Sequence, residues 1–176
     1  MRRPTLQHEL RKKRPFDAPE VEAYLNIVRT AAVLGAEPAR ILREAGLSGP
    51  AYNVLRILRG HHPAGLPSQA IGAQMVTLVP DVTRLVDRLQ KAGLVRRART
   101  EHDRRVVLVR ITKAGLDLLA RLDRPVEEAH KKQLGHLSRR ELAELSRLLV
   151  KARYPDGASP APVPRARAEY RRSRPR

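Results

Sequence analysis

The sequence predicts a mainly α-helical fold with one small β-hairpin. Between residues 20 and 153, apolar residues recur every three to four positions, the spacing of amphipathic helices. One stretch, VVLVRI at 106–111, alternates with period two instead, which is typical of a strand. Residues with helix-capping or helix-ending chemistry separate these segments, so the boundaries can be predicted one by one.

The first helical segment is expected at 20–34, where valines and leucines share one face. Gly35 and Pro38 are expected to interrupt or kink it, because proline lacks the amide donor of the helix ladder. A second piece, 38–45, is expected to continue the helix and to end at Gly46.

The next two helices follow serine residues. Ser48 is expected to cap a helix that runs to about Gly60. After a loop, Ser68 is expected to cap a short helix with the sequence SQAIGAQM.

A third helix is predicted at about 79–92, within the run PDVTRLVDRLQKAG that begins at Pro80. Pro80 is expected in its first turn, Asp81 suits the positive end of the helix dipole, and Gly93 ends the helix. Its apolar stripe consists of Val82, Leu85, Val86 and Leu89.

The period-two strand 106–111 has a partner at 94–99, LVRRAR, and the polar connection TEHDRR fits a hairpin tip. Thr112 is expected to cap a long helix that Pro125 can bend. The last helix begins at a capping box, Ser138 with Glu141, and carries Leu142, Leu145, Leu148 and Leu149.

The charge of the chain predicts a polyanionic partner. Lys and Arg number 36 against 18 Asp and Glu, which gives a net charge of +18. The excess lies at both ends and in the stretch 94–111, which holds six basic and two acidic residues. Nucleic acid is the first expectation and an acidic membrane surface the second. The chain has no cysteine, which excludes disulfides, thiolate metal sites and cysteine redox switches.

Composition divides the chain into three parts. Residues 1–17 are expected to form a basic, flexible arm, 18–153 the folded domain, and 154–176 a disordered tail rich in Pro and Arg. No apolar run approaches the roughly 18 residues of a membrane span. No apolar segment follows the basic N-terminus, so a secretory signal is not expected. The expected location is the cytoplasm.

The order of elements predicts a winged helix-turn-helix at about 48–111, in which the 79–92 helix enters the major groove of double-stranded DNA. Arg84 can pair with guanine, and Thr83 can meet a thymine methyl group or a phosphate. Arg88 is expected to meet phosphate, while Arg104 and Arg105 at the hairpin tip suit a narrow minor groove. Asp103 is expected to hold the tip in shape by pairing with Arg105.

The run VTRLVDRLQKAGLVRRARTEHDRRVVLVRITKAG resembles the recognition helix and wing of the multiple-antibiotic-resistance regulator (MarR) family. LSGPAYNVLRILRG resembles the preceding helix of that family, and LGHLSRRELAELSRLL its terminal dimerisation helix. The resemblance covers about 20–153. It departs from the family at Pro80–Asp81, where Ser or Thr is common, and at Pro38, inside what is usually one long helix.

The resemblance implies roles for particular residues. Asp103 and Arg105 match the Asp-x-Arg pair of the wing, and Thr83 and Arg84 match positions that touch DNA. Ser68 and Gln69 match the start of the supporting helix near phosphates. Together with the residue chemistry, the expected DNA-binding set is Ser68, Gln69, Pro80, Asp81, Thr83, Arg84, Arg88, Arg104 and Arg105, with Asp103 stabilising the wing.

The expected function is that of a dimeric, sequence-specific transcriptional regulator that represses by steric competition. The helices at about 20–45 and 112–152 exceed what the small motif needs, so they are expected to form a homodimer on a near-palindromic site. The resemblance also implies a small aromatic or lipophilic ligand, with Tyr52, Arg56 and the pair His61–His62 near that region.

Enzymatic activity, a cofactor and a metal site are not expected, because no arrangement of catalytic or ligand side chains is evident. The alternative function is that of a non-specific basic protein associated with DNA or RNA, in which the two tails supply most of the affinity.

Overall fold

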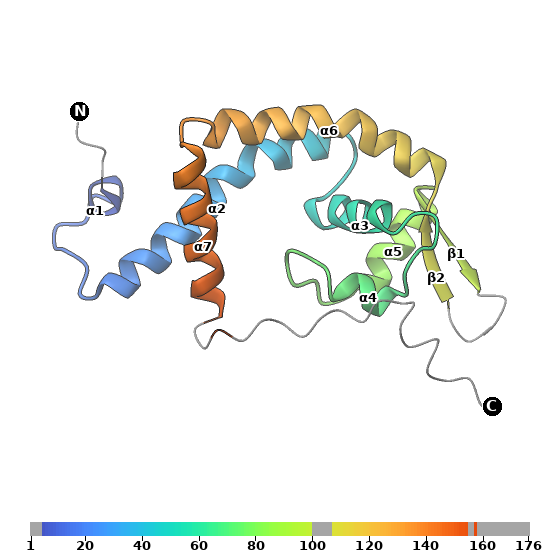
Figure 1. Cartoon of the computed structure of the whole chain (residues 1–176), viewed down its shortest axis with the longest axis horizontal. Coiled ribbons are helices and arrows are strands. Elements are labelled where there is room, and N and C mark those ends of the chain that lie inside the picture. Colours follow the sequence, from blue (N-terminus) through green and yellow to red (C-terminus); the bar gives the residue numbers. More distant parts are fainter. Residues whose placement is uncertain (1–4, 100–106, 155–156, 158–176) are drawn as a thin grey trace.

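The computed structural model describes residues 5–99, 107–154 and 157 (Figure 1). The expected fold class, mainly helical with one small hairpin, is confirmed. The elements in chain order are α1 (Leu6–Glu9), α2 (Pro19–Glu44), α3 (Gly49–Gly60), α4 (Ser68–Gly72), α5 (Val82–Lys91), β1 (Val95–Arg99), β2 (Val107–Ile111), α6 (Lys113–Leu134) and α7 (Arg139–Arg153).

Gly35 and Pro38 were expected to interrupt or kink the first helix. The interruption is wrong, since α2 is continuous over 26 residues. Pro38 removes only its own amide from the ladder, and the bonds on either side keep the helix in register. The end of α2 follows the prediction. Gly46 adopts a φ of +74°, a left-handed conformation that glycine reaches without strain, and the Leu47 amide closes back on the Leu42 carbonyl at 2.8 Å.

Three of the expected helix caps are confirmed. The Ser48 hydroxyl accepts from the Ala51 amide, and the Thr112 hydroxyl accepts from the Gly115 amide. Ser138 and Glu141 form the reciprocal capping box at the start of α7.

Two expected boundaries need correction. Ser68 is the first residue of α4 rather than its cap; Pro67 holds the cap position, with no side-chain hydrogen bond, and the helix ends at Gly72. The recognition helix α5 begins at Val82, with Asp81 as its cap, so Pro80 lies before the helix and not in its first turn. The Asp81 carboxylate satisfies the Arg84 amide at 2.8 Å, which fixes the start of the helix.

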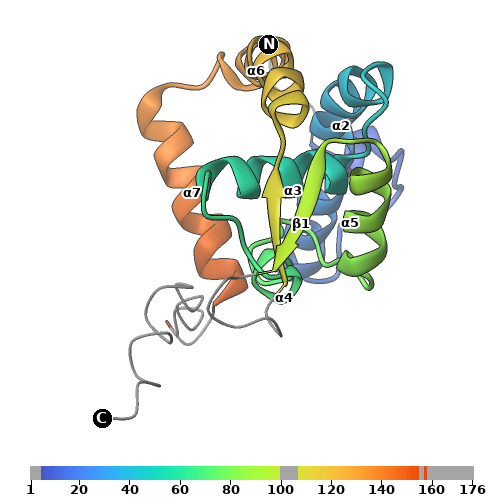
Figure 2. The ribbon, with the colours of Figure 1, turned by 90° about the vertical axis from the view of Figure 1, so that its right-hand side faces the viewer.

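One apolar core joins the helix-turn-helix to the long helices. α3 lies at its centre, in contact with α2, α4, α5, β2 and α6 (Figure 2). Burying these aliphatic side chains supplies the main force that holds the elements together. The largest fully buried side chains are Leu55, Leu58, Leu66, Ile71, Leu119, Val54, Val86, Val95 and Val109.

The hairpin pairs β1 with β2 in antiparallel register, with Val95 opposite Ile111 and Arg97 opposite Val109. An isolated bridge between Leu66 and Val109 adds the segment before α4 to the far side of β2. Gly65 makes this approach possible: its φ is +78°, and a Cβ atom there would lie 2.5 Å from the Val109 carbonyl oxygen.

The two ends of the described chain differ in how they are packed. At the N-terminal end, Leu6 of α1 is buried, and Glu9 pairs with Arg29 of α2 at 2.6 Å. At the other end, α6 is continuous through Pro125 and packs along α2, whereas α7 contains no buried residue.

Candidate nucleic-acid interface

The recognition helix α5 buries one face and exposes the other. Leu85, Val86 and Leu89 are at most 3% exposed and lie in the core, as the helical stripe predicts. Thr83, Arg84 and Arg88 are exposed on the opposite face. The Arg84 side chain is 84% exposed, so a partner outside the chain can reach it.

Asp81 has two partners at the start of α5. One carboxylate oxygen accepts from the Arg84 amide, and the other lies 3.1 Å from Arg84 Nε. The residue therefore caps the helix and neutralises part of the charge of Arg84 in the free protein. Since this ion pair is exposed to water, it is weak and can yield to a phosphate or a base.

The hairpin is fixed to the recognition helix by Arg97. This side chain, on the core-facing side of β1, bonds to Asp87 and to Gln90, both on α5. At the other end of the hairpin, the Thr112 hydroxyl donates to the Gly93 carbonyl at 2.8 Å. These contacts make α5 and the hairpin one unit, with α4 packed against α5 (Figure 2).

The other expected DNA-binding residues lie in different places. Ser68 is half-buried at the start of α4, and Gln69 and Pro80 are exposed. Asp103, Arg104 and Arg105 fall outside the described residues, so their roles stay expectations.

A second ion pair joins the helix-turn-helix to the long helix α6. Arg59 of α3 donates to both carboxylate oxygens of Asp123, at 2.7 and 2.9 Å. The guanidinium holds the pKa of the Asp123 carboxyl below its ordinary value, against a smaller opposing effect of burial. Nearby, Arg56 donates to the Tyr52 hydroxyl at 2.9 Å and lies over the Tyr52 ring.

Sequence reasoning missed Arg97 and the Arg59–Asp123 pair. The contact with Arg97, which leaves Asp87 half-buried, joins residues of two different elements. The pair Arg59–Asp123 joins residues 64 positions apart, a distance over which sequence periodicity carries no signal.

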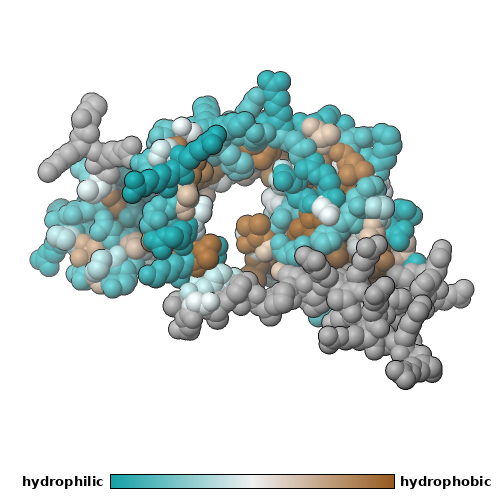
Figure 3. Space-filling view, viewed as in Figure 1, coloured by the Kyte–Doolittle hydropathy of each residue, from teal (hydrophilic) through white to brown (hydrophobic). Residues whose placement is uncertain are grey.

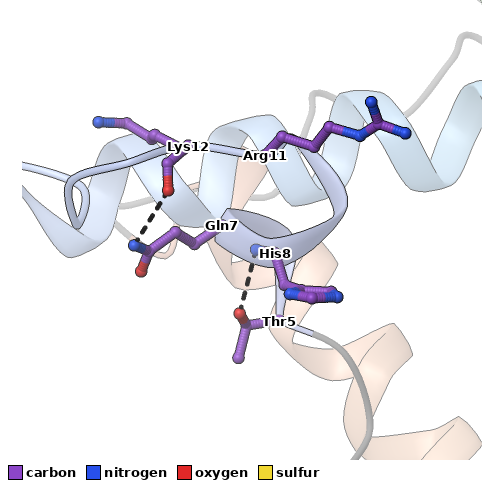
Figure 4. A pocket seen from close by; sticks show the side chains of 5 residues that line it. All are labelled: Thr5, Gln7, His8, Arg11 and Lys12. Atoms are coloured by element: carbon purple, nitrogen blue, oxygen red, sulfur yellow. Dashed lines mark hydrogen bonds between the residues drawn. The ribbon is translucent and has the colours of Figure 1, made fainter.

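Two pockets lie outside the helix-turn-helix. One, of about 550 Å³, is a groove between α2 and α6. Its lining is half apolar and half charged: Ile41, Ala45, Leu122, Pro125 and Ala129, with Glu37, Arg40, Glu44, Glu128 and Lys132. The other, of about 570 Å³, lies on the N-terminal segment (Figure 4). All its lining residues come from that segment: Thr5, Gln7, His8, Arg11 and Lys12.

Among the residues that the structure describes, no three His, Cys, Asp or Glu side chains lie close enough together to hold a metal ion. None of the described helices is both long and apolar enough to span a membrane.

The fold and the exposed face of α5 define a winged helix-turn-helix DNA-binding protein, and comparisons with known proteins specify its family. The sequence model described as "MarR family" matches residues 45–106. A crystal structure of a MarR transcription factor from Planctomyces limnophilus is 46% identical, with a TM-score of 0.59; the match covers 77% of this chain and 98% of that one. The chain therefore belongs to the MarR family of transcriptional regulators.

Two more distant relatives extend the comparison. The transcriptional repressor IacR of Pseudomonas putida is 28% identical over 110 residues, which are 62% of this chain and 65%, just under two thirds, of the relative. CouR from Rhodococcus jostii RHA1, solved bound to p-coumaroyl-CoA, shares the fold at a TM-score of 0.68 and 23% identity; the match covers 82% of this chain and 100% of that one. Since IacR is a transcriptional repressor and the Planctomyces limnophilus protein a transcription factor, the expectation that the chain is not an enzyme is confirmed.

Proposed function

We propose that the protein is a homodimeric repressor that reads a near-palindromic DNA site with α5 and the hairpin. The observation that carries this proposal is the face of α5 that presents Thr83 and Arg84 to solvent while Leu85 and Val86 are buried. An arginine on an exposed recognition helix can bond in bidentate fashion to guanine, and Arg88, one turn further on, suits a phosphate.

The dimer is supported by apolar surface that the chain itself leaves open. α7 buries none of its residues, and an unsupported helix of 15 residues is marginal in water. α2 also carries exposed apolar side chains, so the two helices suit a second copy of the same chain. The exposed apolar residues of the two helices are Val21, Tyr24, Ile27, Val28 and Val33 on α2, and Leu145, Leu148 and Val150 on α7.

The dimer sets the form of the DNA site. Two-fold symmetry places the two recognition helices in successive major grooves, about 34 Å apart. Occupying such a site blocks transcription by steric competition, and the repressor IacR among the relatives supports this mode.

Selection of bound fragments from a random duplex library tests the proposal. The expected result is one motif in two inverted halves, separated by about one helical turn. Enrichment without a common motif would favour the alternative, a non-specific basic protein. That alternative also expects random duplex to compete nearly as well as any selected site, and deletion of residues 1–17 and 155–176 to abolish binding.

We propose that a small aromatic or lipophilic ligand relieves the repression. The groove between α2 and α6 has the volume for such a molecule, and the p-coumaroyl-CoA complex of CouR supports an aromatic ligand class. The melting temperature of the protein, measured with a panel of aromatic acids and their CoA esters, tests whether such a ligand binds. A hit should lose its shift in Ile41→Glu, which places a carboxylate among the apolar lining residues of the groove, and should keep it in Lys113→Glu, outside the groove.

A further inference from the structure

The loop between α4 and α5 exposes apolar side chains that the helix-turn-helix does not use. Val76 is 86% exposed and Leu78 is fully exposed, at 103% of the reference value. These are the highest exposures among the large apolar residues that are exposed in the described chain. Two such side chains, two positions apart, form a small apolar knob.

The backbone of the loop is anchored. The Val76 amide donates to the Asn53 side-chain oxygen of α3 at 2.8 Å. On either side of the knob, Met75 and Val79 pack against the core. The exposure of Val76 and Leu78 is therefore a feature of a fixed loop whose flanking residues are held inside.

The chemistry of the loop is unlike that of a surface for phosphates. From Met75 to Pro80 the sequence MVTLVP has no charged residue, and the next residue is the acidic Asp81. DNA backbones are contacted by basic and hydrogen-bonding side chains, whereas apolar knobs suit an apolar protein surface.

The position of the loop indicates which protein surface Val76 and Leu78 contact. In Figure 1 the loop projects from α4 toward the side of the molecule on which α7 lies. Figure 3 shows a gap through the molecule there, with apolar surface bordering it on both sides. The exposed residues Leu145 and Leu148 of α7 belong to the apolar surface already assigned to the dimer.

We infer that Val76 and Leu78 pack against a second copy of this chain, as an extension of the dimer interface up to the base of the recognition helix. This inference rests on the proposed function, because it requires the dimer. Its consequence is a direct connection: the loop ends at Asp81, the cap of α5, so subunit association positions the helix that reads DNA.

The first test is the dimerisation of the full chain without DNA. Leu78→Ser keeps the charge of the loop unchanged, and because Leu78 is fully exposed within its own chain, the fold is expected to persist. Fluorescence-detected sedimentation should show a dimer dissociation constant raised about tenfold or more, since two leucines per dimer lose their burial. Val107→Ser, at an exposed site on the hairpin, is the matched control and should dimerise like the natural chain.

The second test does not depend on altered affinity. The chain has no cysteine, so Leu78→Cys creates a single thiol that can carry a benzophenone photocrosslinker. Irradiation without DNA should yield a covalent two-chain product, and Lys113→Cys, at the hairpin end of α6, should not.

The outcomes separate the two proposals. A natural chain that sediments as a monomer overturns the dimer and the loop contact together. A natural dimer that Leu78→Ser leaves unchanged, without a two-chain crosslink, overturns the loop contact alone. If Leu78→Ser dimerises normally but binds a single DNA half-site more weakly, the loop contacts DNA, and the inference is also overturned.

Discussion

Arg84 and Arg88 lie one turn apart on the same exposed face of α5, and the proposed roles differ. Arg84→Ala should weaken binding to the preferred site by about 1–3 kcal/mol and relax the preference at one base pair. Arg88→Ala should weaken binding to all DNA sequences about equally and reduce the salt dependence of binding by about one counterion. Binding titrations against single-base variants at several salt concentrations distinguish them. An equal loss on every sequence for Arg84→Ala would make it a phosphate contact.

Asp81 is an acidic residue in the surface proposed to bind DNA, and its capping bond to the Arg84 amide explains its presence. Asp81→Ala should lower the free energy of unfolding by about 0.5–2 kcal/mol, because the amide loses its acceptor. Asp81→Asn keeps an acceptor and should fold like the natural chain. Urea denaturation compares the two. Equal stability of all three proteins would show that the cap contributes little.

At the scale of elements, Arg97 joins β1 to α5 through Asp87 and Gln90. Arg97→Ala should lower the free energy of unfolding by about 1 kcal/mol, a modest value because the pair is partly exposed. It should also speed hydrogen exchange in β1, since the hairpin loses its attachment. Arg96→Ala, on the outer face of the same strand, should change neither the free energy of unfolding nor the hydrogen exchange of β1. Unaltered exchange in Arg97→Ala would mean that the core alone holds the hairpin.

The elements also show what the sequence can and cannot predict. Apolar periodicity predicted the buried stripe of α5 and the strands, because these signals are local. The continuity of α2 through Pro38 was missed, since one lost hydrogen bond is outweighed by packing, including the burial of Leu42. The contact between Asp87 and Arg97 was missed because the two residues belong to different elements, and such pairs depend on the fold.

At the scale of the whole molecule, Arg59 and Asp123 connect the DNA-binding part to α6. The lowered pKa of Asp123 means that the folded state favours the ionised carboxylate. Its contribution to stability is therefore complete above the ordinary carboxyl pKa and is lost as the pH falls below about 4.

Asp123→Asn tests this connection. It should cost about 1 kcal/mol at neutral pH, a value discounted because the Asp123 side chain is 42% exposed. The variant should also lose part of the acid-dependent decrease in stability. Asp117→Asn, which removes an exposed pair with Lys113 on the same helix, is the control and should have no measurable effect. Identical pH profiles for both variants would show that the Arg59–Asp123 pair does not stabilise the fold.

The unburied state of α7 has a further consequence for the proposed regulator in the cell. Where folding of the last helix is completed by a second subunit, a dilute chain is both unpaired and partly unfolded. At concentrations below the dimer dissociation constant, promoter occupancy then rises with the square of the protein concentration. The regulator would stay silent when scarce and act sharply once its copy number passes the dimer dissociation constant.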